Sequence, residues 1–99
     1  MKLVKIVKSS KKNKKFDAIF LKDNGKNKTV SFGAAGMNDY TLTKDKDARL
    51  RYRKRHMKDL KTEANKKGLG AGSLSFYLLW GDSTSLQENI KAYRKRFNL

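Results

Sequence analysis

The stretch that decides the fold is KLVKIVKSSKKNKKFDAIFLKDNGKNKTVSFGAAG, residues 2–36. Residues 3–7 are mostly apolar and alternate loosely with lysine, which predicts a short first strand. Residues 16–21 follow a period of two, and the Asn24-Gly25 pair after them is typical of a tight hairpin turn. We therefore expect a three-stranded antiparallel sheet over residues 2–33.

The pattern becomes helical after the small-residue segment at 33–36. A helix is predicted over residues 45–65, with Asp45 as its N-cap and Gly68 as its stop. At about 100° per residue, one side of this helix collects its apolar side chains: Leu50, Met57, Leu60 and Ala64. Arg53 falls inside that stripe, so we expect it either to extend its charge to the surface or to pair with a buried acid.

Two further helices are expected toward the C-terminus. Residues 85–88, Ser-Leu-Gln-Glu, have the spacing of a capping box and predict a helix over 85–97. The apolar segment 73–80 is predicted to be a short helix that stops at Gly81. The fold class is thus α+β, one small domain over residues 1–99, with a three-stranded antiparallel sheet followed by two longer helices and a short apolar helix. The expected core residues are Phe16, Phe20, Phe32, Leu60, Leu79, Trp80, Ile90 and Phe97.

Charge is the strongest feature of the composition. The 99 residues contain 25 Lys and Arg against nine Asp and Glu, a formal net charge of +16, whereas ordinary small domains carry roughly 2 to 8 charges in magnitude. Self-repulsion of this size favours a polyanionic partner: nucleic acid, an anionic membrane surface or an acidic protein face. No apolar run approaches the roughly 20 residues of a membrane span, no secretory signal is evident, and there is no cysteine for disulfides. We expect a soluble protein that stays inside a cell or a particle.

The segment 49–58 is the best candidate for binding a polyanion. Arginine binds phosphate oxygens in a bidentate way, and Tyr52 and His56 between the cations could stack on bases. The alternative interpretation is a solvated basic face with Tyr52 at the rim of the core. A second cluster lies at 91–96, and the lysines at 11–15 suggest a mobile arm that gains affinity by counterion release. The candidate polyanion-binding residues are Arg51, Lys54, Arg55, Lys58, Lys61, Lys91, Arg94, Lys95, Lys11, Lys12, Lys14 and Lys15.

Catalysis has little support in the sequence. His56 is the only histidine, and the segment 33–36 lacks the Gly-Lys-Ser/Thr ending of a phosphate-binding loop. Five acids could in principle hold magnesium: Asp39, Asp45, Asp47, Asp59 and Glu63. Helix capping accounts for Asp45 and Asp47, and ion pairing with neighbouring cations accounts for Asp59 and Glu63. We therefore expect no enzymatic activity, no catalytic or metal-binding residue and no cofactor. Trp80 is expected to be a core residue.

A family resemblance covers nearly the whole chain. It rests on residues 29–41 (TVSFGAAGMNDYT), Arg51-Tyr52, Arg55-His56, Leu78-Leu79-Trp80, Leu86, Ile90 and Arg96-Phe97. In these motifs the chain resembles a family of small basic proteins of unassigned function found in giant and other large nucleocytoplasmic DNA viruses. The resemblance implies no catalytic or binding residue, because the family has no established activity. It implies a place in the virion, and in the host cytoplasm or viral factory during assembly.

Two functions remain open from the sequence. The first is a non-enzymatic architectural protein of a large DNA virus particle that binds a polyanion, with the DNA backbone as the preferred partner and no sequence specificity. The second is a minor capsid protein whose basic face bridges major capsid proteins, through their acidic surfaces, or the inner membrane.

Overall fold

Three antiparallel strands in the order β1-β2-β3 form the only sheet of the computed structural model, which describes residues 1–99. The strands are β1 (Lys2–Lys8), β2 (Lys14–Leu21) and β3 (Asn27–Ala34). Leu3 pairs with Phe20 across β1 and β2, and Phe16 pairs with Phe32 across β2 and β3. These pairs confirm the predicted sheet.

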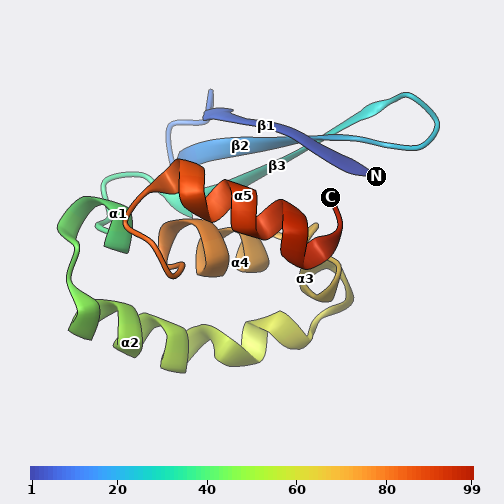
Figure 1. The fold of residues 1–99 in the computed structure, drawn as a ribbon. Coiled ribbons are helices and arrows are strands. Elements are labelled where there is room, and N and C mark those ends of the chain that lie inside the picture. The colour runs from blue at the N-terminus through green and yellow to red at the C-terminus, as the bar shows by residue number, and fades with distance from the viewer.

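The helices cover one face of this sheet in two layers (Figure 1). The first layer contains α4 (Ala71–Leu74), which continues into a π-helical turn (Ser75–Leu79), and α5 (Leu86–Phe97). The second layer, on the far side of the first, contains α2 (Lys46–His56) and a 3-10 turn (Met57–Lys61). After that turn, α3 (Glu63–Lys66) lies beside the end of the first layer, in contact with α4. The short α1 (Tyr40–Thr43) connects β3 to α2. Sheet followed by helices confirms the predicted α+β class.

The core lies between the sheet and the first helical layer. Its buried residues are Leu3, Ala18, Phe20, Phe32, Leu74, Leu78, Leu79, Ile90 and Tyr93. Four of the eight predicted core residues are among them. Phe16, Trp80 and Phe97 only pack against this cluster from its edge, and the partly buried Leu60 lies outside it. Leu60 does not reach the core because the first helical layer separates its segment from the sheet.

The predicted single helix over residues 45–65 is wrong in its length. Asp45 caps α2 as expected, and its carboxylate accepts hydrogen bonds from two backbone N–H groups. The backbone then becomes extended at Thr62, with ψ of 152°, and the Thr62 hydroxyl caps α3 by accepting from the Asn65 N–H. Gly68 ends this segment at φ of 76°, where an added Cβ would lie 2.5 Å from Cγ of Phe97. Only glycine fits there.

The prediction that the apolar side of the 45–65 segment faces the core is also wrong. Leu50 and Met57 are 62% and 58% exposed, and no residue of α2 is buried. The inward face instead carries two arginines, a tyrosine and a histidine: Arg49, Tyr52, Arg53 and His56. The cations are tolerated there because they donate hydrogen bonds to backbone carbonyls, Arg49 to Gly81 at 2.6 Å and Arg53 to Trp80 at 2.8 Å.

The two C-terminal helices form where the sequence predicts them. The Ser85 hydroxyl accepts a hydrogen bond from the Glu88 N–H at 3.3 Å and caps α5. Residues 71–79 are helical throughout, although the last turn is π rather than α. None of the helices combines the length and the apolar character that a membrane crossing requires.

Candidate polyanion-binding surface

The outward face of α2 and of the 3-10 turn carries a row of four cations, Arg51, Lys54, Arg55 and Lys58, called here the basic row. They follow the i, i+3, i+4, i+7 spacing that places side chains on one side of a helix. All four are exposed, and none forms an ion pair with a carboxylate. Lys61, also exposed and unpaired, ends the 3-10 turn.

The inward face of α2 fixes the direction of the basic row. The Tyr52 ring stacks on Trp80, with centroids 4.5 Å apart and planes 9° apart, and the His56 ring lies 4.3 Å from Tyr52 on centroids. Burial, and then the negative charge of Asp59, raise the pKa of the Tyr52 hydroxyl. Asp59 accepts from His56 Nδ1 at 2.9 Å and forms no ion pair with a cation of the basic row.

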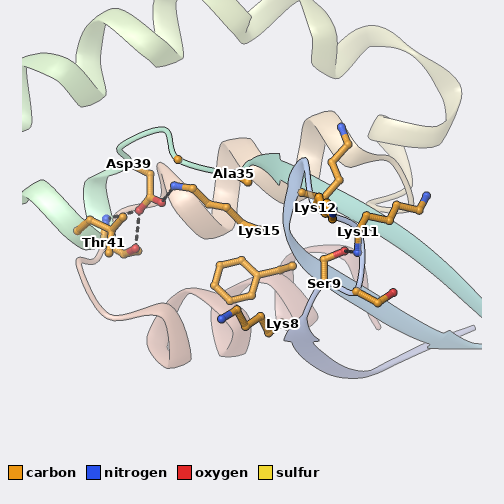
Figure 2. Close-up of a pocket in the computed structure, with 13 residues that line it drawn as sticks. Lys8, Ser9, Lys11, Lys12, Lys15, Ala35, Asp39 and Thr41 are labelled. Carbon is orange, nitrogen blue, oxygen red and sulfur yellow. Dashed lines mark hydrogen bonds and ion pairs between the residues drawn. The ribbon is translucent and has the colours of Figure 1, made fainter.

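A second basic feature is a hollow of about 710 Å³ between the β1–β2 turn and residues 35–42, called here the lysine pocket. Figure 2 shows it, with Phe16 among the residues that line it. Its cations are Lys8, Lys11, Lys12, Lys14 and Lys15. Lys11 and Lys12 are exposed, and their side chains extend away from Asp39 (Figure 2). Lys14 is half-buried at the start of β2.

Lys15 differs from the other lysines of this pocket because its charge is neutralised. Its Nζ donates to Oδ2 of Asp39 at 2.5 Å, and the two side chains are 13% and 2% exposed. The other oxygen of Asp39 accepts from the N–H and the hydroxyl of Thr41. Asp39 thus caps α1 and holds Lys15 in place, so the charge of Lys15 has a partner within the fold.

The segment expected to be a mobile arm forms a hydrogen-bonded turn. The Ser9 N–H donates to the Lys15 carbonyl at 3.0 Å, and the Lys14 N–H donates to the Lys11 carbonyl. The hydroxyls of Ser9 and Ser31 both donate to Asp17, and these bonds lower the pKa of its carboxyl. The turn therefore presents Lys11 and Lys12 from a defined backbone.

The cations of α5 have divided roles. Lys91 and Lys95 are exposed and one helical turn apart. Arg94 instead donates to the carbonyls of Leu3 and Val4, both at 3.0 Å, and joins α5 to β1. The predicted site residues thus lie in three groups on separate elements, and the structure does not bring all of them together.

Most of the acids have a structural partner, and Asp47 and Glu88 lie in the first turns of helices. Asp45 and Asp47 lie at the N-terminus of α2 as predicted, and Glu63 pairs with Lys67 at 3.9 Å. No three His, Asp or Glu side chains come together as a set of metal ligands.

The sequence reasoning missed Trp80 and Asn38 as site residues. Trp80, assigned to the core, is half-buried and lines a hollow beside the basic row together with the exposed Asn38. The mostly apolar run at 74–80 concealed this, because such a run predicts burial along its whole length.

Fold and surface together define a small α+β protein with an unusually high density of unpaired cations. Residues 4–56 match the model of a family of unknown function, DUF5754, and the chain belongs to this family. The matched segment contains the whole lysine pocket and the basic row as far as Arg55, whereas α5 lies outside it. Searches of curated proteins and of solved structures find no match.

Proposed function

We propose that this protein is a non-enzymatic architectural protein that binds the DNA backbone without sequence specificity in the particle of a large DNA virus. The observation that carries the proposal is the basic row on α2, a helix without a single buried residue. Of the 25 Lys and Arg, only Lys15, Arg49 and Lys67 form ion pairs with carboxylates, so the other 22 are left without one. The virion location rests on the family resemblance described above.

Phosphate contact explains the composition of the basic row. Arginine forks bind phosphate oxygens in a bidentate way, and lysine adds mobile point charges. Residues 49–61 contain no Asn or Gln for reading adenine. Contacts of this kind position a protein on DNA and carry no sequence information. Unrelated duplexes should therefore compete equally.

The salt dependence of duplex binding tests this proposal. With roughly five to eight phosphates neutralised, log affinity should fall against log salt with a slope of about −4 to −7. The double variant Lys54→Gln/Lys58→Gln should make the slope shallower by about 2 units. The matched control Lys26→Gln/Lys28→Gln removes two exposed lysines near the β2–β3 turn, at the opposite end of β2 from the lysine pocket. This control should change the salt slope by less than half as much.

Two results would contradict the proposal. One is a salt slope that is the same for the Lys54/Lys58 variant as for the wild type, which would show that the basic row does not contact DNA. The other is duplex binding that disappears near physiological salt while the protein captures an acidic capsid protein from disrupted virions. The second result would establish the minor-capsid alternative.

A further inference from the structure

A cleft runs between α2 and the loop that connects β3 to α1. It encloses about 360 Å³ and is called here the aromatic cleft. Its lining residues are Gly36, Met37, Asn38, Ala48, Arg51, Tyr52, Arg55 and Trp80. A second hollow of about 250 Å³ shares five of these residues and extends to His56. The cleft therefore combines aromatic rings with two cations of the basic row.

The rings of the cleft are held in place before any ligand arrives. Tyr52 stacks on Trp80, and His56 packs on Tyr52. The π-helical turn ends with the Trp80 N–H donating to the Ser75 carbonyl, five residues earlier, at 3.1 Å. Arg53 holds the Trp80 carbonyl from the α2 side. Turns of this kind interrupt α-helices frequently at functional sites.

The polar groups of the cleft are available to a ligand. Arg51 and Arg55 are exposed and have no carboxylate partner, and Arg55 makes only one side-chain hydrogen bond, to His56 at 3.3 Å. The Asn38 side chain makes no hydrogen bond within the protein. It lies opposite the arginines and can both donate to and accept from the edge of a heterocycle.

We infer that the aromatic cleft binds an unpaired base of a single-stranded nucleic acid, with the base against the exposed side of Trp80 and the edge of Tyr52 and the flanking phosphates on Arg51 and Arg55. This inference rests on the proposed function. It adds that the cleft takes a single strand, while the basic row contacts phosphates of either form. Bases inside a duplex are stacked on their neighbours and cannot enter a cleft, whereas single strands present bases that stack on aromatic side chains. Stacking tolerates any base, so the binding stays without sequence preference.

The path of a bound nucleic-acid strand beyond the cleft is indicated by a residue that lines both hollows. Gly36 lines both the aromatic cleft and the lysine pocket, so only the β3–α1 loop separates them. A strand that crosses this loop meets Lys11 and Lys12 at the lysine pocket. The two hollows would then hold successive nucleotides, one by its base and the next by its phosphates.

Trp80 is the only tryptophan, so its fluorescence reports the proposed contact directly. A short thymidine oligonucleotide should quench this fluorescence at saturation. A hairpin duplex with the same number of phosphates should bind with little quenching. The variant Trp80→Leu, followed by anisotropy of labelled DNA, should lose at least about fivefold in affinity for the single strand, the lower end of one base stack. Its affinity for the duplex should change less than twofold. The control is Leu50→Ala, which alters an exposed residue of α2 outside the cleft.

The outcomes separate this inference from the proposed function. If the single strand and the duplex both bind with the expected salt slope and Trp80 emission stays constant, the cleft does not hold a base and the backbone proposal stands. If neither binds, both fail. Should Trp80→Leu not fold, the quenching of the wild-type protein still decides.

Discussion

The guanidinium carbon of Arg53 lies 4.2 Å from the centroid of the Phe76 ring, while its Nη1 donates to the Trp80 carbonyl at 2.8 Å. This is the cation that the sequence places inside an apolar stripe. Arg53 is half-buried and forms no ion pair with an acid. Burial, and then the neighbouring Arg49, lower the pKa of Arg53. The face of the Phe76 ring and the Trp80 carbonyl offset the cost of burying the guanidinium, so Arg53 joins α2 to the π-helical turn.

Arg53→Ala should lower the free energy of unfolding by about 2–3 kcal/mol, because it removes a partly buried cation–π contact and a charged hydrogen bond. Arg53→Lys should recover less than half of this loss, since an ammonium lacks the planar fork. Lys54→Ala, one residue along on the exposed face, should change stability by no more than about 0.5 kcal/mol. Urea denaturation measures all three. Equal effects of the two alanine variants would mean that Arg53 does not join the layers.

The sheet and α5 were predictable from the sequence because local patterns specify them. The alternation in residues 16–21, the Asn24-Gly25 turn and the capping box at 85–88 each act over a few residues. The inward face of α2 was not predictable in this way. Its partners are the Phe76 ring and the carbonyls of residues 80 and 81, at least 23 residues away in sequence. A hydropathy pattern predicts that arginine is exposed to solvent, and it contains no information about partners so far away in the sequence.

The candidate site was predictable to a similar extent. The basic row follows from the spacing of its cations along one helix. The ion pair of Lys15 depends on Asp39, 24 residues away, and the cleft includes Trp80, which follows a π-helical turn within an apolar segment. Neither leaves a local pattern in the sequence.

The Lys15–Asp39 pair predicts different effects for neighbouring lysines. Lys15→Met should destabilise the fold by about 2–4 kcal/mol, because it leaves a buried carboxylate without its cation. The double variant Lys15→Met/Asp39→Asn should recover part of that loss, since asparagine can still cap α1. For duplex DNA, Lys15→Met should leave the salt slope unchanged, whereas Lys12→Met should make it shallower by about 1 unit. A slope that changes equally in both variants would show that Lys15 contacts DNA.

Tyr93 predicts how stability depends on alkaline pH. Its side chain is 1% exposed, and its hydroxyl donates to the Gly68 carbonyl at 2.7 Å and lies 2.9 Å from Oγ of Ser73. Burial raises the pKa of the Tyr93 phenol. In the unfolded chain this phenol ionises near pH 10, so above that pH the folded state binds more protons than the unfolded state. Stability from this group is therefore complete below about pH 9 and declines as pH rises past 10.

Tyr93→Phe should separate the two contributions of this hydroxyl. At pH 7 the variant should be less stable by about 1–2 kcal/mol, because the buried Gly68 carbonyl loses its donor. Between pH 9 and 11 its stability should fall less steeply than that of the wild type. Part of the decline should remain, since the pKa of Tyr52 is also raised. Urea denaturation across this pH range measures both effects, and comparison with the wild type at each pH cancels the titration of the many lysines. Parallel curves above pH 9 would mean that Tyr93 ionises in the folded protein as readily as in the unfolded chain.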